Sequence, residues 1–231
     1  NVLIAAYVHC GLNDQALELF GRMQEEGFFP DAITFTCILK ACGNLNLAMM
    51  GQSIHAKVYT QGLLRKNVLL GTALVGMYAK CGMLIKAQEV FDLLPARDVV
   101  SWNALIDGYV QNGRIDEAII CLKHMQEDGF APDSVSFACI LKGCSAMKGE
   151  EIHAKACKER LLGKDPLLGN AIINMYVRCG SIMDAYCAFI MIGIKPTEAW
   201  NAIIGGFTNC GKFEEGLKLF DQMQKEGVKP T

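Results

Sequence analysis

The chain has 231 residues, of which 52% are hydrophobic and 20% charged, so it can bury a core and is not a disordered tail. Its apolar runs, such as 118–122, are far shorter than the ~20 residues of a membrane-spanning helix, and we expect no membrane partner. The net charge of −2 counts against nucleic-acid binding, because contact with phosphates usually requires a basic face.

The chain is built from repeats, which show as segments that recur at long intervals. The segment 99–106 returns at 197–204, and residues 1–4 match the end of the same phrase. A long and a short kind of repeat follow the first kind, and this order recurs before the chain ends on the first kind. In chain order the repeats are 1–31 (lacking about four leading residues), 32–67, 68–98, 99–133, 134–165 (shortened by about four), 166–196 and 197–231.

Each repeat predicts a first helix, a turn, a second helix and a stop, in that order. Repeat 99–133 shows the pattern most fully, because apolar residues at helical spacing in 105–109 are followed by Gly113, which suits a helix C-terminus. A second apolar stripe runs through 115–125, and Pro132 prevents this helix from continuing. The same turn glycine recurs in the other repeats of the first and short kinds, at Gly11, Gly82, Gly180 and Gly211.

Packing residues recur at fixed distances from these turns. An aromatic residue lies four positions before each turn glycine, and a small residue, as at Ala118, lies five positions after it. The small residue lets the two helices of a repeat approach closely, and phenylalanines such as Phe91 fill the layer between repeats. No single hairpin can bury both of its faces, so neighbours must stack. The sequence therefore predicts an all-α fold, an α-α superhelix or solenoid of right-handed type.

Two families of helical repeats share the aromatic and small positions. Tetratricopeptide repeats hold a constant length of ~34 residues, whereas the repeat lengths here alternate. The second helix ends on methionine in repeats of the first kind, as at Met125, and the closing phrase is Gly-x-x-Pro-Asp, as in 129–133. The chain thus resembles the pentatricopeptide-repeat family, specifically its land-plant subclass with P, L and S repeats. The phrases that carry this resemblance are 101–106, 35–42 with 54–57, and 77–82.

The resemblance implies a function in binding single-stranded RNA, with one base read by each repeat. In this family the fifth and last residues of a repeat choose the base. Asn1 with Asp31 and Asn103 with Asp133 resemble the uracil-preferring pair, and Thr72 with Asp98 resembles the guanine-preferring pair.

The remaining repeats follow the family's code less well. In repeat 166–196 the last residue paired with Asn170 is Pro196, which has no polar side chain. In repeat 197–231 the pair Asn201 and Thr231 indicates only a weak preference for a pyrimidine. The long repeats carry Thr36 with Asn67 and Ala138 with Asp165. The resulting RNA preference is U-n-G-U-n-Y-Y, read from the 5′ end.

The resemblance also implies which side chains pack against the bases and which meet the phosphates. Apolar residues stand at the second position of five repeats, and we expect them to contact the faces of the bases: Ile33, Leu69, Val100, Val135 and Leu167. Glu198 at the equivalent place suits a base poorly. Lys80 and Arg178, at the ends of first helices, are expected to contact phosphates.

Several of these residues also have simple structural interpretations. Asp31, Asp98 and Asp133 immediately precede helices and suit helix N-caps, a role compatible with base reading. His55 and His153 recur only in the long repeats and are interpreted as structural. The eleven cysteines recur with the repeats or stand singly and include no Cys-x-x-Cys, so we expect packing rather than zinc binding, in a reducing compartment.

We expect no catalysis and no cofactor in this segment. A nucleotide deaminase requires His-x-Glu followed by Pro-Cys-x-x-Cys, and neither motif occurs. No phosphate-binding loop or Gly-x-Ser-x-Gly is present either. The chain begins on Asn1, inside an expected helix, and ends at a repeat boundary, so it is interpreted as a segment of a longer protein. A deaminase domain beyond Thr231 stays open.

The family resemblance further implies a mitochondrial or chloroplast specificity factor for C-to-U RNA editing or other RNA processing. Its partners would be single-stranded RNA and proteins of an editing complex or a ribosome. The alternative is a protein-binding scaffold in an organellar ribosome or another complex. The negative charge, Pro196, Glu198 and the shortened repeat 134–165 favour that alternative.

Overall fold

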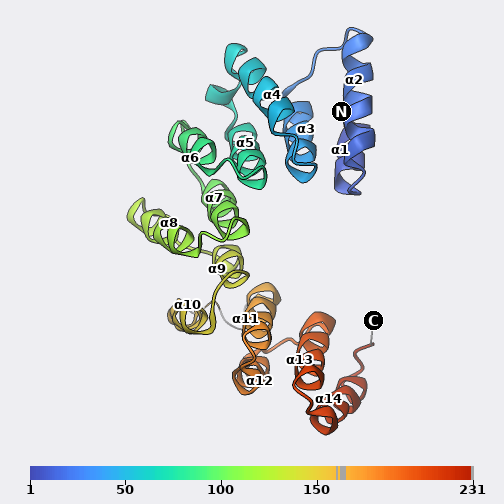
Figure 1. Ribbon diagram of the computed structural model, residues 1–231, viewed down its shortest axis with the longest axis vertical. Coiled ribbons are helices and arrows are strands. Elements are labelled where there is room, and N and C mark those ends of the chain that lie inside the picture. The colour runs from blue at the N-terminus through green and yellow to red at the C-terminus, as the bar shows by residue number, and fades with distance from the viewer. Residues whose placement is uncertain (160, 162–164, 230–231) are drawn as a thin grey trace. The chain divides into compact units, whose positions relative to one another are not determined.

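The computed structural model describes residues 1–159, 161 and 165–229 (Figure 1). Within these ranges the chain forms fourteen α-helices and one short 3-10 helix, and no β-strand. The chain divides into two compact units, an N-terminal unit of residues 1–130 and a C-terminal unit of residues 131–231. The predicted all-α fold of stacked helix hairpins is confirmed.

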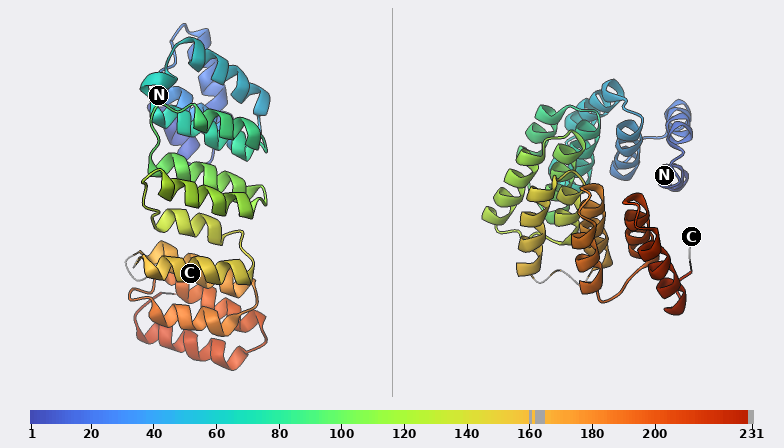
Figure 2. Two further views of the ribbon diagram at one scale, coloured as in Figure 1. Left: turned by 90° about the vertical axis from the view of Figure 1, so that its left-hand side faces the viewer. Right: turned by 60° about the horizontal axis from the view of Figure 1, so that its bottom comes forward.

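The N-terminal unit consists of two helical layers. Its first helices are α1 (Val2–His9), α3 (Ala32–Asn44), α5 (Val68–Lys80) and α7 (Val99–Gln111). Their partners are α2 (Asn13–Glu25), α4 (Ala48–Thr60), α6 (Leu84–Asp92) and α8 (Ile115–Glu127), with the 3-10 helix at Leu64–Lys66. Each first helix packs on the next, α1 on α3, α3 on α5 and α5 on α7, and the second helices cover one side of this row (Figures 1 and 2).

The C-terminal unit repeats this arrangement with six helices. Its first helices, α9 (Ser134–Leu141), α11 (Pro166–Arg178) and α13 (Thr197–Asn209), pack in sequence. Each also packs on its own partner: α10 (Ala146–Lys158), α12 (Ile182–Met191) and α14 (Phe213–Lys225). Helix α9 has 8 residues where the equivalent α3 has 13, since the shortened repeat has lost the last turn of its first helix.

Turn chemistry explains where the helices of a hairpin separate. Gly113 has a φ of +73°, a conformation that side chains with a Cβ rarely adopt. The N–H of Arg114 donates to the carbonyl of Tyr109 at 2.8 Å, and the N–H of Gly113 donates to that of Val110 at 3.0 Å. These bonds satisfy carbonyls that the end of α7 leaves unpaired, which is the usual glycine-terminated helix end.

The recurrent packing residues lie in the interior, as their spacing indicates. Ala16, Ala87, Ala118 and Ala185 are fully buried between the two helices of their hairpins. Edge-to-face aromatic pairs join neighbouring repeats, with ring centroids 4.6 Å apart for Phe91 and Trp102 and 4.7 Å for Phe189 and Trp200. None of the helices in the described ranges has the length and apolar character to cross a membrane.

Candidate nucleic-acid interface

A slot opens on the first-helix layer of the N-terminal unit, between α3, α5 and α7. Its volume is about 250 Å³, just below the ~300–1,000 Å³ of typical small-ligand pockets. Leu69, Thr72, Gly76 and Lys80 of α5 all line it, because spacings of three and four residues place them on one helical face. Thr36 and Lys40 of α3 and Val100 of α7 also line it. We call this cavity the α5 slot.

Small residues keep the α5 slot open. A Cβ built at Gly76 would meet no atom within 4 Å, so the backbone of α5 faces open space there. Gly43 is different, because its Cβ would lie 3.2 Å from the Cδ of Lys80 and 3.3 Å from the Cα of Met77. Gly43 therefore lets α3 and α5 approach closely, while Gly76 leaves space for a ligand.

Thr72 presents an acceptor to the α5 slot. Its hydroxyl donates to the carbonyl of Val68 at 3.0 Å, as a threonine inside a helix often does. Since the only hydroxyl proton is used within the helix, the oxygen keeps lone pairs for an N–H donor of a ligand. The hydroxyl of Thr36 likewise donates within its own helix, to the carbonyl of Ala32 at 2.7 Å.

Large apolar side chains stand exposed at the second position of five repeats. Between 40% and 60% of the surface of each remains accessible in Ile33, Leu69, Val100, Val135 and Leu167. Two of them, Leu69 and Val100, line the α5 slot. Within each unit, exposed apolar side chains on successive first helices indicate a binding surface rather than an internal packing layer.

The structure brings Asn1 and Asp31, the first and last residues of the first repeat, into direct contact. The Nδ2 of Asn1 donates to the Oδ2 of Asp31 at 2.7 Å. The other carboxylate oxygen, Oδ1, accepts from the backbone N–H of Thr34 at 2.8 Å and caps α3. The Thr34 N–H bond is the main cause that lowers the pKa of Asp31, so the carboxylate stays ionised. One carboxylate thus serves both the N-cap and the pair.

Asp98 and Asp133 also cap helices. Each accepts from the backbone N–H three residues later, at 2.7 Å from Ser101 and 2.8 Å from Ser136. Thr72 and Asp98 do not hydrogen-bond to each other within the part of the chain that the structure describes. At the start of α13 the equivalent residue is Pro196, and no side-chain cap forms.

The remaining predicted base-reading residues differ in exposure. Asn103 is buried on α7, and Asn201 is exposed on α13. Asn170 is half-buried, and its Oδ1 is buried without a hydrogen-bond partner among the described residues. Thr231, the predicted partner of Asn201, lies outside the described residues.

The two predicted phosphate contacts are engaged with neighbouring helices. The Nζ of Lys80 donates to the Oδ1 of Asn44 at 2.6 Å from an exposed position on the rim of the α5 slot. The Nη2 of Arg178 donates to the carbonyls of Leu141 and Cys144, both at 2.9 Å, and so closes the shortened end of α9. Because its guanidinium donates to two backbone carbonyls, Arg178 has a structural role at the end of α9.

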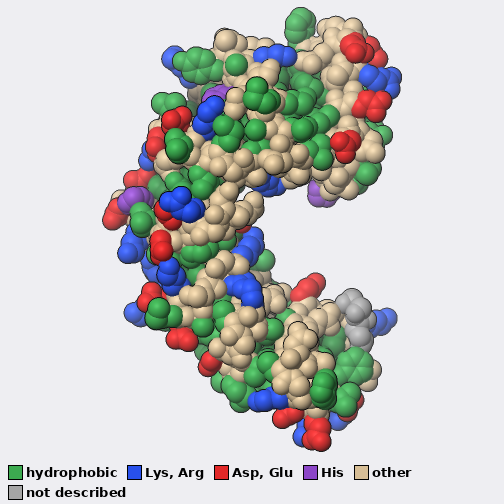
Figure 3. Space-filling view, in the orientation of Figure 1, with side chains coloured by type: hydrophobic (Ala, Val, Ile, Leu, Met, Phe, Trp, Pro, Cys, Tyr) green, Lys and Arg blue, Asp and Glu red, His purple; other side chains and the backbone are tan. Residues whose placement is uncertain are grey.

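Sequence reasoning missed Lys40, a second cation beside the α5 slot. Lys40 is exposed on α3, four residues after Thr36, and lines the slot together with Lys80. Its spacing from the fifth position of its repeat was the available signal, since residues four apart share a helical face. On the face that Figure 3 shows, acidic and basic side chains are interspersed.

The two histidines of the long repeats, and two of the buried cysteines, have structural surroundings. The Nδ1 atoms of His55 and His153 lie 2.9 and 3.1 Å from the hydroxyls of Tyr78 and Tyr176 on the following first helices. Burial lowers the pKa of both imidazoles. Burial also raises the pKa of the Cys42 and Cys144 thiols to about 11, so both stay protonated. No cluster of three metal-binding side chains occurs within the described ranges.

Comparison with known proteins places the repeats in context. The model of the PPR repeat family matches residues 1–44, 97–146 and 196–231, and a PPR repeat model matches residues 72–99. A chloroplastic pentatricopeptide repeat-containing protein of Arabidopsis thaliana is 35% identical over 231 residues, covering 100% of this chain and 43% of its own length. A mitochondrial protein of the same description and organism is 33% identical over 234 residues, covering 99% and 34%.

The fold is also similar to that of a solved structure. The pentatricopeptide repeat protein PPR10 from maize matches 99% of this chain and 39% of its own, with a TM-score of 0.56 and 21% identity. The same protein has been crystallised with an 18-nucleotide RNA element, and that structure matches with a TM-score of 0.56 and 22% identity. The chain spans 43% or less of the curated relatives named above and 40% or less of these structures.

Proposed function

The chain belongs to the pentatricopeptide-repeat family, and from this premise we propose that it binds single-stranded RNA on its first helices, one base per repeat. The observation that carries the proposal is the α5 slot, which combines an acceptor, two exposed apolar side chains and two lysines. The binding of RNA by maize PPR10 supports the proposal at the level of the fold.

The chemistry of the α5 slot suits one nucleotide. Leu69 and Val100 stand on neighbouring first helices, where they would contact the two faces of a base between them. Thr72 would meet the base edge with its hydroxyl oxygen, and Lys40 and Lys80 at the rim would meet phosphates. Apolar and stacking contacts hold any base, so selectivity would come from the edge.

Acceptors on the protein favour guanine at this repeat. The hydroxyl of Thr72 donates its hydrogen bond to the carbonyl of Val68, and the Asp98 side chain offers carboxylate oxygens as acceptors. Guanine offers two N–H donors along its Watson–Crick edge, whereas adenine offers an acceptor and a single amino group. The guanine expected from sequence therefore agrees with the donor and acceptor inventory at Thr72.

We infer the finer specificity from sequence and local geometry together. The hydrogen-bonded pair of Asn1 and Asp31 supports uracil for the first repeat, and the overall preference proposed is U-n-G-U-n-Y-Y. Some relatives carry chloroplastic or mitochondrial names, which supports an organellar location. A role as an organellar RNA-editing or RNA-processing specificity factor is the form of this function that the family resemblance favours.

Binding of short RNAs by the purified chain tests the proposal. One oligonucleotide carries U-n-G-U-n-Y-Y, and a control of equal composition carries the same bases scrambled. We expect at least tenfold tighter binding to the first, because good base-edge contacts contribute about 1–3 kcal/mol each. Equal affinity for both RNAs would overturn sequence-specific binding. Absent RNA binding, together with stable co-purification of proteins after nuclease treatment, would favour the scaffold instead.

A further inference from the structure

The segment 93–98 connects α6 to α7 and ends on Asp98, the proposed partner of Thr72. Helix α6 has 9 residues, whereas α2 and α8 have 13 each. The short repeat therefore lacks the last turn of its second helix, and a non-helical stretch takes its place. The Asp98 carboxylate is held on α7 by its N-cap bond to Ser101, and the contacts of this stretch fix it further relative to α5.

One end of the segment is fixed beside Thr72. A Cβ built at Gly71 would lie 2.2 Å from the Cδ2 of Leu94, so the leucine side chain occupies the space that any other residue at position 71 would need. Gly71 directly precedes Thr72 on α5. The start of the connecting segment is thus packed against the helix that carries the fifth residue of the repeat.

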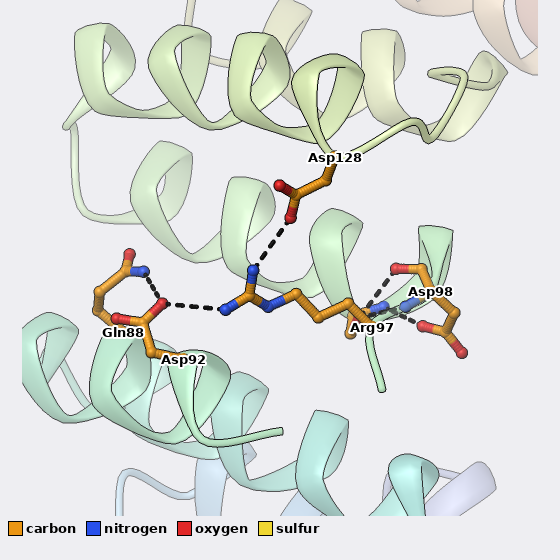
Figure 4. Close-up of polar contacts among 6 residues, drawn as sticks. Gln88, Asp92, Arg97, Asp98 and Asp128 are labelled. Atoms are coloured by element: carbon orange, nitrogen blue, oxygen red, sulfur yellow. Dashed lines mark hydrogen bonds and ion pairs between the residues drawn. The ribbon is translucent and has the colours of Figure 1, made fainter. Parts of the chain in front are cut away.

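The other end is fixed by Arg97 (Figure 4). Its guanidinium lies 3.0 Å from the Oδ2 of Asp128, at the C-cap of α8, and 3.7 Å from the Oδ1 of Asp92, the last residue of α6. The same group lies over the rings of Phe91 and Trp102, 5.0 and 6.0 Å from their centroids. Arg97 therefore ties α6, α7 and α8 together at one point.

The backbone directs Arg97 and Asp98 to opposite sides. Asp98 has an extended conformation, with φ −140° and ψ 173°, and successive side chains of an extended chain alternate in direction. Figure 4 shows the Arg97 side chain running toward Asp92 and Asp128 while that of Asp98 lies on the other side. Any force that holds Arg97 against the second helices also orients the neighbouring carboxylate.

We propose that Arg97 is a positioning residue that fixes the Asp98 carboxylate relative to Thr72 and thereby sets the base preference of the α5 slot. The inference rests on the proposed function. Arg97 contacts Asp92 and Asp128 on the side away from Asp98. The arginine therefore acts through the backbone rather than on the base.

The second short repeat supplies an internal comparison. There Lys195 takes the place of Arg97, with its Nζ 5.5 Å from the ring centroid of Phe189. Ile192 packs on Gly169 as Leu94 packs on Gly71, since a Cβ at Gly169 would lie 2.5 Å from the Cδ1 of Ile192. The residue after Lys195 is Pro196, which has no carboxylate whose position could be fixed. Removing Lys195 should leave base preference unchanged.

The test compares Arg97→Ala and Arg97→Lys with Lys195→Ala in the full chain. Dissociation constants are measured for four RNAs that differ only at the third position of U-n-G-U-n-Y-Y, and for a second set that differs only at the first position. In the Arg97 variants we expect the guanine preference over adenine to fall about tenfold, while the uracil preference at the first position, opposite Asn1, persists. Lys195→Ala should keep both preferences.

The outcomes separate this inference from the function on which it rests. If the wild-type chain shows no guanine preference, the base-reading proposal fails and the role of Arg97 fails with it. If the wild type prefers guanine and both Arg97 variants weaken binding to all four RNAs by the same factor, only the positioning role is overturned. Asp128→Asn provides a milder variant should Arg97→Ala unfold, and it is expected to reduce the guanine preference in the same direction.

Discussion

Gly76 lies on the face of α5 that lines the α5 slot, four residues after Thr72. A Cβ there meets no atom within 4 Å, so the first side-chain carbon of Gly76→Leu displaces no part of the protein and the rest of the side chain extends toward the slot. Replacing an interior helix glycine by leucine stabilises a helix by about 0.8 kcal/mol, because glycine has the greater backbone entropy to lose. The free energy of unfolding should therefore rise by about 0.5–1 kcal/mol.

The same leucine should weaken RNA binding. Its side chain would occupy the slot of about 250 Å³ in which Leu69 and Val100 are proposed to contact a base. Loss of that base's stacking contacts costs about 1–3 kcal/mol, or roughly 5- to 150-fold in affinity. Stability and affinity are thus expected to change in opposite directions, which general damage to the fold cannot produce.

Urea unfolding and fluorescence anisotropy with a labelled RNA measure the two quantities. Gly21→Leu on α2 is the matched control, because its Cβ also meets no atom within 4 Å but lies outside the α5 slot. We expect this control to gain similar stability and to bind RNA as the wild type does. If Gly76→Leu binds RNA as tightly as Gly21→Leu, no base occupies the slot and the reasoning is refuted.

Three further changes have defined outcomes. Asp98→Ser should keep the stability of α7 within about 0.5 kcal/mol, because serine is as good an N-cap, yet it should reduce the guanine preference; a retained preference in RNA binding would exclude Asp98 from base reading. Arg178→Ala should lower the free energy of unfolding by about 1.5–3 kcal/mol in urea titrations, because two carbonyls at the end of α9 lose a charged donor. The lowered pKa of His55 and His153 means that the unfolded chain binds protons more readily than the folded one, so stability should be full above about pH 6.5 and fall as the pH drops below it. The double variant His55→Gln, His153→Gln should flatten this dependence between pH 7.5 and 5.5, and an unchanged slope would assign it to other groups.

Part of the candidate site followed from the sequence because it depends on local order. The N-cap at Asp31 was predicted from its place directly before a helix, at the last position of its repeat. The N-caps at Asp98 and Asp133 were predicted from residue type and position alone. Each of these contacts joins residues that are near neighbours in the sequence.

Other parts required the packed structure. Arg178 was expected to contact a phosphate. Its guanidinium donates to the carbonyls of Leu141, the last residue of α9, and of Cys144 beyond it, because the four-residue shortening of that repeat leaves a helix end to be closed. Gly76 and Gly43 look alike in sequence, yet only the space above Gly76 is empty. Nothing in the order of residues distinguishes a glycine that admits a neighbouring helix from one that leaves a cavity.

The sequence by itself determined the repeats, their helices and turns, and the face of each first helix that carries polar and apolar side chains at regular spacing. These features arise from interactions within about 36 residues, which the periodic pattern records directly. Only the tertiary structure decided which of those side chains border an open slot and which instead hydrogen-bond to the ends of helices. It also decided which contacts Arg97 makes in the segment that precedes Asp98. Such choices depend on the distances between helices, and those are set by the packing of all the side chains between them.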